Sequence, residues 1–231
     1  MATNFIKLSI ICISSIVLFY SCDKENYKKE FYSDGTLKSK VQINDKGVLN
    51  GLYEAYYKNG QTKIAGTVRN NLKLGWWDTY DSLGHISSKK EYLIFRDSTY
   101  KNQSIFYDKT GSIKNDVSSF YKIELPDTIT LGKNIGRIHY NSNFLKTKEK
   151  FLQVIIDNQY SDSEIRKDTF VEDFTNTRFG VFAHKIGTKK ITGTIIEKLI
   201  YVTEINKDSS ELIIKNHKKY FEKTVYVKDA L

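Results

Sequence analysis

Four glycines recur at nearly even spacing in the first half of the chain, and this recurrence constrains the fold most. They are Gly35, Gly60, Gly84 and Gly111, spaced 25, 24 and 27 residues apart. An aromatic residue stands four positions before each one: Phe31, Tyr56, Tyr80 and Tyr107. An aromatic strand, a two-residue turn whose glycine accepts a positive φ, and a return strand make a β-hairpin. One hairpin is marginal in water, so the pattern predicts stacked hairpins with the four aromatic side chains packed in one row.

Two of the units carry a further glycine nine positions before the shared one, at Gly51 and Gly75. Segments 51–60 and 75–84 resemble the bacterial, antitoxin-type variant of the MORN repeat, whose units read Gly-x-Trp/Tyr-x-x-Tyr-x-x-x-Gly. The resemblance implies an extended sheet of stacked hairpins over residues 28–116 that serves as an interaction surface. We do not transfer the antitoxin role, because a cytoplasmic antitoxin does not suit an exported chain.

Aromatic residues outside the repeat-defining positions are the candidates for a binding face. They are Tyr53, Tyr57, Trp76 and Trp77. Neighbours on a strand point to opposite faces, so one of the two tryptophans should face outward. Such rings could stack on a sugar or on a partner's side chains, and packing within the sheet is the alternative reading.

The repeat of glycine and aromatic residues ends near residue 117, and short strands with alternating hydrophobic residues follow. Hydrophobic residues alternate over 121–125 and 179–183, and β-branched residues dominate 191–202. About seven short strands at roughly ten-residue spacing predict a β-sandwich. Segments 187–197 and 220–227 are similar to the last strands of bacterial immunoglobulin-like domains. The expected fold class is therefore all-β, with a MORN-like repeat sheet followed by an immunoglobulin-like β-sandwich over residues 117–231.

The N-terminal segment has the pattern of a signal peptide, which we assign to residues 1–21. Lys7 precedes an uncharged run over 8–21. At about 1.5 Å per residue, this run reaches about 21 Å as a helix, short of the roughly 30 Å thickness of membrane hydrocarbon.

Residues 18–22, Leu-Phe-Tyr-Ser-Cys, resemble the lipobox of bacterial lipoproteins. The resemblance implies that Cys22 is acylated and that 22–27 form the lipidated N-terminus and tether, with the lipid bilayer as partner. Asp23 and Glu25 resemble the surface-export signal of some Bacteroidota lipoproteins. The implied address is the bacterial cell envelope, at the outer membrane and on either its periplasmic or its surface side.

The charge of the chain gives no sign of a nucleic-acid partner. Its formal net charge is +9, but the basic residues are spread over both halves. Nucleic-acid binders usually gather them on one face or tail. We therefore expect no nucleic acid among the partners.

No pattern typical of catalysis or metal binding is present. Cys12 lies in the leader and Cys22 carries the lipid, so no cysteine remains for a disulfide or metal. The four histidines lack ligand spacing, and the common nucleophile and phosphate motifs are missing. Carboxylate pairs, Glu172 with Asp173 or Asp162 with Glu164, stay open as acid and base.

From these features we expect no cofactor, no metal and no enzymatic activity. The predicted function is a non-catalytic binding or scaffold role for an unknown envelope protein or glycan. The alternatives are a glycan-binding or glycan-processing envelope protein that uses exposed aromatic and carboxylate side chains, and peripheral lipid binding by the repeats.

Overall fold

The computed structural model describes residues 26–144, 149–172, 176–207 and 209–229 of the chain. This part forms fifteen strands in three sheets, which confirms the predicted all-β class. Within these ranges no helix could cross a lipid bilayer. The predicted signal peptide and Cys22 lie outside the described residues.

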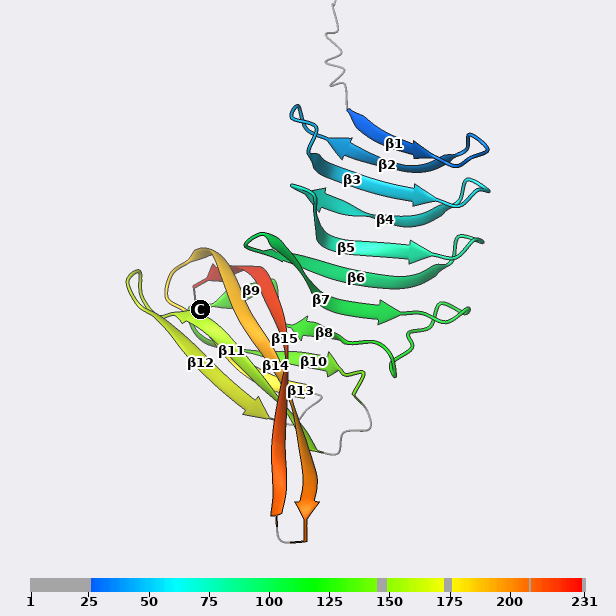
Figure 1. Cartoon of the computed structure of the whole chain (residues 1–231). Coiled ribbons are helices and arrows are strands. Elements are labelled where there is room, and N and C mark those ends of the chain that lie inside the picture. Colours follow the sequence, from blue (N-terminus) through cyan, green and yellow to red (C-terminus); the bar gives the residue numbers. More distant parts are fainter. Residues whose placement is uncertain (1–25, 145–148, 173–175, 208, 230–231) are drawn as a thin grey trace, which may run out of the picture.

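The first half forms one antiparallel seven-stranded sheet whose strands follow each other in chain order (Figure 1). Its strands are β1 (Tyr27–Phe31), β2 (Leu37–Ile43), β3 (Leu49–Tyr56), β4 (Thr62–Arg69), β5 (Leu72–Tyr80), β6 (Ile86–Phe95) and β7 (Ser98–Phe106). The predicted series of hairpins is therefore present as a continuous meander.

The glycine turns are one residue longer than predicted. In the first turn the Tyr32 N–H donates to the Thr36 carbonyl at 2.8 Å, and the Gly35 N–H donates to the Tyr32 carbonyl at 3.0 Å. The loop thus has three residues and ends on Gly35, whose φ is 82°. A type I turn followed by a left-handed glycine restores the strand twist that a type I turn alone would splay. Gly60, Gly84 and Gly111 repeat this geometry with φ between 83° and 87°.

Each of the first three glycine turns is followed by a β-bulge opposite the repeat-defining aromatic residue. Glu30 pairs with Ser39 while Phe31 pairs with Leu37, so Lys38 is skipped by the ladder. Lys63 and Ser87 are skipped in the same way in the next two hairpins. A bulge bends and twists the strand locally. The repeat-defining aromatic residues therefore mark the bend beside each turn.

The second half forms two further sheets that pack face to face and that we call the two-sheet unit. Its strands are β8 (Phe120–Glu124), β9 (Thr128–Thr130), β10 (Gly132–Asn141), β11 (Glu149–Gln159), β12 (Ile165–Glu172), β13 (Asn176–Ala183), β14 (Gly187–Asn206) and β15 (Ser209–Lys228). One sheet has the order β13-β10-β8, and the other has the order β12-β11-β14-β15-β9. β9 runs parallel to β15.

Alternating residues from both sheets fill one core, as the sequence pattern predicted. Ile138 and Phe179 come from the smaller sheet, and Leu152, Val154 and Ile195 come from the larger one; all five are buried. β10 and β12 were not singled out from the sequence. β14 and β15 have 20 residues each, so β14 extends beyond the long run expected over 191–202, and β15 is not the short strand that was expected.

The two halves meet where β7 approaches β15. The Asn102 side chain accepts the Tyr220 N–H and donates to the Tyr220 carbonyl, both at 2.8 Å. Phe95 and Tyr100 place their rings against Tyr220, with centroids 4.7 Å and 5.6 Å away. This junction fixes the end of the seven-stranded sheet against the two-sheet unit.

Candidate binding surface

The two faces of the seven-stranded sheet differ in packing. One face carries the small buried core of the sheet, built around Trp77 with Val41 and Val68. The opposite face we call the open face, and it is defined by Lys40, Leu52, Glu54, Tyr56, Trp76, Asp78 and Lys89. Consecutive cross-strand pairs link Lys40 to Glu54, Ala65, Asp78 and Lys89 in one row across β2–β6.

Two ion pairs lie on either side of Ala65 in this row on the open face. Lys40 Nζ lies 2.7 Å from Glu54, and Lys89 Nζ lies 3.5 Å from Asp78. Hydrogen bonding from Lys40 holds the pKa of Glu54 below its ordinary value, and the same contact raises the pKa of Lys40. The Lys40 ammonium also lies 5.9 Å from the centre of the Tyr56 ring. Cross-strand ion pairs of this kind hold the surface side chains in place and leave the face accessible.

One acceptor on the open face is left unsatisfied. Asp78 Oδ1 is buried and has no hydrogen-bond partner among the described residues. Trp76, two positions earlier on the same strand, projects to the same side, and Lys89 Nζ lies 6.0 Å from its ring centre. A buried acceptor without a donor costs free energy, and because this oxygen is closed to solvent, a ligand does not reach it in this arrangement. Trp76 and Lys89 thus present a ring and a cation together on the open face.

The adjacent tryptophans divide between the two faces, as strand alternation requires. Trp76 is 40% exposed and Trp77 is 5% exposed. Leu52 on the open face is 56% exposed, although the sequence reading did not select it. Leu52 lies two residues before Glu54 on the same strand, so both side chains point to the same face. This alternation is the signal that could have identified Leu52 from the sequence.

Tyr53 and Tyr57 serve the sheet itself, so they are not free for a partner. The Tyr53 ring packs against Trp77 with centroids 5.2 Å apart. The Tyr57 hydroxyl donates to the Tyr80 carbonyl at 2.8 Å. Trp77 Nε1 donates to the Thr67 carbonyl at 3.1 Å, which satisfies the buried indole. Of the four candidate residues, only Trp76 lies on the open face.

The repeat-defining aromatic residues do not form the predicted packed row. Phe31 is 58% exposed, and Tyr56, Tyr80 and Tyr107 are half-buried. Tyr56 and Tyr80 lie two residues after Glu54 and Asp78 on their strands, so strand alternation places their rings on the open face, away from the core around Trp77. Sequence reasoning missed the residues that pack there instead, which include Tyr92 and Ile64.

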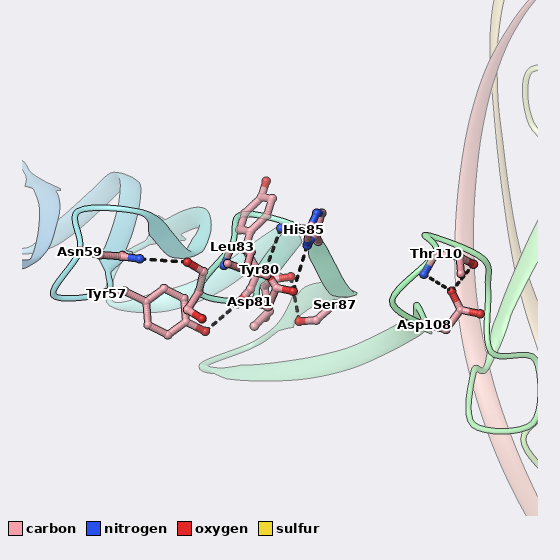
Figure 2. Close-up of polar contacts among 11 residues, drawn as sticks. Tyr57, Asn59, Tyr80, Asp81, Leu83, His85, Ser87, Asp108 and Thr110 are labelled. Carbon is pink, nitrogen blue, oxygen red and sulfur yellow. Dashed lines mark hydrogen bonds and ion pairs between the residues drawn. The ribbon is translucent and has the colours of Figure 1, made fainter.

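Hydrogen bonds link neighbouring glycine turns at one end of the strands (Figure 2). The Asn59 side chain donates to the Ser82 carbonyl in the next turn at 2.9 Å. Asp81 accepts the N–H groups of Leu83 and His85, both at 2.9 Å. These bonds, first of all the one from His85, hold the pKa of Asp81 below its ordinary value. These turns therefore stabilise the sheet, and the polar groups named here are already hydrogen-bonded to one another.

A groove of about 630 Å³ lies between the seven-stranded sheet and the two-sheet unit. Its lining includes Leu74, Glu91 and Phe95 from the first and Thr192, Tyr220 and Glu222 from the second. Glu91 accepts from Asn102 and Gln103, and Glu222 pairs with Lys190 at 2.6 Å. Both carboxylates already bind neighbouring side chains. What the groove offers a ligand is therefore its shape and its aromatic side chains.

The carboxylates proposed as acid and base lie in separate ion pairs. Asp162 lies 3.1 Å from His184, and Glu164 contacts Arg166. Glu172 pairs with Arg178 at 2.9 Å, while Asp173 lies outside the described residues. Among the residues that the structure describes, no three metal-ligating side chains gather into a group that could hold an ion.

No protein-family model, no curated protein and no solved structure matches this chain.

Proposed function

We propose that this protein is a membrane-anchored envelope lipoprotein that binds or scaffolds another molecule, without catalysis, through the open face of its seven-stranded sheet. The observation that carries the proposal is that β1–β5 form a single layer. Within the described residues, this sheet packs against the two-sheet unit through β7 and through Phe95 at the end of β6. A sheet normally covers at least one face with a second layer, so an uncovered sheet with Leu52 and Trp76 exposed is suited to contact a partner.

A MORN-like character for the seven-stranded sheet is part of this proposal. It is supported by the recurrence of one turn geometry at Gly35, Gly60, Gly84 and Gly111. It is also supported by the repeated bulge beside the first three of these turns. Successive hairpins that bury their rings only against neighbours give an extended surface.

We also infer an immunoglobulin-like arrangement for the two-sheet unit. In that fold strands A, B and E share one sheet, and strands C, F and G share the other. Taking β8, β10 and β13 as A, B and E, and β11, β14 and β15 as C, F and G, matches this division. β12 then extends the second sheet beside β11, as strand C′ does in variable-type domains.

The anchor proposal rests on the sequence around Cys22 and gains a geometric consequence from the fold. Cys22 stands five positions before Tyr27, where β1 begins. At about 3.5 Å per residue, this span reaches at most about 17 Å. β1 is the edge of the sheet farthest from the two-sheet unit (Figure 1). An acylated Cys22 would therefore hold β1 near the bilayer, with the two-sheet unit about 29 Å farther out at the usual strand spacing of about 4.8 Å.

Affinity capture from intact cells tests the binding role. The full chain is compared with a Leu52→Ser/Trp76→Ala double variant and with Ile165→Ala, whose residue is even more exposed, on the two-sheet unit. We expect the double variant to lose the captured partner and Ile165→Ala to retain it. Equal capture by all three chains would remove the open face from the account. Incorporation of labelled fatty acid, lost in Cys22→Ala, tests the anchor separately.

A glycan is the second candidate for the ligand, favoured by the arrangement of Trp76 and Lys89. An exposed indole can stack on a sugar ring, and the Lys89 ammonium beside it can donate to a sugar hydroxyl. Titration of the protein with purified envelope polysaccharide, read by tryptophan fluorescence, tests this. A signal change that is lost in Trp76→Phe would support glycan binding, and an unchanged spectrum would reject it.

A further inference from the structure

The end of the β14–β15 hairpin projects from the two-sheet unit as a two-stranded ribbon (Figure 1). We call residues 200–207 and 209–216 the arm. β11 pairs with β14 only as far as Ile200. On the other side, β9 pairs with β15 only over Tyr226–Lys228. An isolated two-stranded ribbon is marginally stable in water, so the arm needs a further contact to hold a fixed structure.

The arm exposes hydrophobic side chains that a solvated ribbon does not require. Ile200 pairs with Ile214 and Val202 pairs with Leu212, so these four side chains lie on one face. Val202, Leu212 and Ile214 are exposed. An uncovered strand edge beside such residues is a template for strand pairing.

The outward backbone groups of β15 can be assigned from its other contacts. The N–H and C=O of Tyr220 both point to the Asn102 side chain on the outer edge, and the Tyr226 N–H donates outward to Asp127. Backbone groups alternate between the two edges along a strand, and the pairing of β14 with β15 is unbroken from Glu211 to Val227. Leu212 and Ile214 therefore also point their N–H and C=O groups outward. No strand pairs with this stretch of edge in the described part of the chain.

The charges on this edge are complementary to those on the same edge of a second copy. Glu211 and Lys215 lie two residues on either side of Ile213, and all three side chains share one face. When a second copy of β15 lies antiparallel with Ile213 opposite Ile213, each Glu211 faces Lys215 of the other copy. Centring the pair on Leu212 or Ile214 instead would place Glu211 opposite Ile213 or His217. Charge thus selects a single register.

The same register also suits the backbone. Leu212 of one copy faces Ile214 of the other, and both residues present outward N–H and C=O groups, so each pair exchanges two hydrogen bonds. Glu211 and Lys215 then occupy non-hydrogen-bonded positions, where opposite side chains come closest. Because the two arms run in opposite directions, the two bodies lie at opposite ends of the joined ribbon.

We propose that the arm is a self-association element in which the β15 edges of two copies pair antiparallel about Ile213. The interface is isologous, as in most closed dimers. It is distinct from the open face, so one chain can dimerise and keep its ligand surface free.

Charge reversal on the full chain tests the register. Sedimentation equilibrium in density-matched detergent should give a dimer for the natural sequence. Glu211→Lys places two like-charged pairs in the interface and should raise the dimer dissociation constant about tenfold. The double variant Glu211→Lys/Lys215→Glu restores both pairs and should return the constant to its starting value. Lys207→Glu, an exposed change in the arm outside the register, is the control.

Cysteine cross-linking gives an independent readout of the same geometry. Oxidised Ile213→Cys should form a covalent dimer, because the two Cβ atoms meet at a non-hydrogen-bonded pair. Glu211→Cys alone should not, since the two sulfurs would be offset by four residues, about 13 Å. The natural chain, in which Cys12 is expected to leave with the signal peptide and Cys22 to carry the lipid, sets the background. A monomeric natural chain, or a dimer insensitive to Glu211→Lys, would overturn the proposal and assign the arm to a different protein or a lipid surface.

Discussion

Gly66 shows how a single residue permits the one well-packed cluster of the seven-stranded sheet. Trp77 lies across Gly66, and a Cβ atom placed on that glycine would come within 2.3 Å of the indole. Tyr53, directly opposite Gly66 in the ladder, packs against the same ring in a tilted arrangement. The missing side chain at position 66 therefore makes room for Trp77.

Gly66→Ala should destabilise the protein by about 2 kcal/mol, because the indole must leave its position. The free energy of unfolding by urea measures this loss. In a Trp77→Leu background the same substitution should cost much less, since the ring that it meets is gone. An equal cost in both backgrounds would show that the packing of Trp77 on Gly66 is not the reason for the glycine.

Lys219 is a buried cation at the junction of the two halves. Its side chain is 7% exposed, and Nζ donates to the Asn102 carbonyl at 2.9 Å. Burial lowers the pKa of Lys219 to about 8, although Glu197 and Glu91 act in the opposite direction. The folded protein therefore binds fewer protons than the unfolded chain between about pH 8 and the ordinary lysine pKa of 10.5.

Stability should consequently rise as the pH increases from 8 toward 10, by an amount that approaches about 3 kcal/mol for the full shift. Burial raises the pKa of Tyr140, which opposes the trend above pH 10, so the measurement belongs below that value. Urea unfolding at several pH values should show the rise in the natural chain and in Lys218→Met, an exposed neighbour. Lys219→Met should reduce the rise to the part contributed by Lys73 and Lys189, whose pKa values burial also lowers. An unchanged slope in that variant would exclude Lys219 as the cause.

At the scale of elements, the three-residue glycine turn is the unit that repeats. Gly60 has a φ of 83° and nothing lies within 4 Å of its missing Cβ, so conformation alone demands glycine there. The Asn59 side chain caps its own turn through the Gln61 N–H and reaches the next turn at Ser82. The turns thus set both the hairpin twist and the alignment of neighbours.

Gly60→Ala should cost about 1–2 kcal/mol, the usual penalty for a left-handed alanine. Gly60→Asn should cost clearly less, because asparagine adopts this conformation more readily. Thermal unfolding of the two variants beside the natural chain measures both. If the two substitutions were equally costly, backbone conformation would not explain the glycine.

The sequence predicted the hairpins but not the details of their packing. Glycine and aromatic spacing located the turns at Gly35, Gly60, Gly84 and Gly111, because a left-handed φ leaves a mark in residue choice. The bulges fall at Lys38 and Lys63, both three residues after their glycine, but a lysine at this spacing does not by itself indicate a skipped pair. Tyr53 was assigned to a binding face because the sequence does not show that its ring packs against Trp77, two strands away.

At the scale of the whole molecule, the junction joins two sheets that are built from separate stretches of sequence. Asn102 and Tyr220 stand 118 positions apart, and the asparagine satisfies both backbone groups of the tyrosine. A contact between residues so far apart has no local pattern, so neither this junction nor the groove beside it could be predicted from the sequence. The length of the arm was missed because its exposed β-branched residues look like those of a buried strand.

Asn102→Ala should uncouple the two halves. It leaves the Tyr220 N–H without its partner, at a cost of about 1–3 kcal/mol, while the Tyr121 hydroxyl still donates to the Tyr220 carbonyl. Calorimetry should then resolve two transitions where the natural chain gives one. Asn50→Ala, an exposed asparagine on β3, should keep the single transition. A single transition in both variants would mean that the coupling lies elsewhere.

The central claim is that the open face of the single-layer sheet holds a partner, and site-specific photocross-linking in living cells tests it most directly. A photoreactive residue at position 76 or 52 should give a discrete cross-linked product, whereas the same group at position 165 should give none. Products of equal yield from all three positions, or from position 165 alone, would contradict the account.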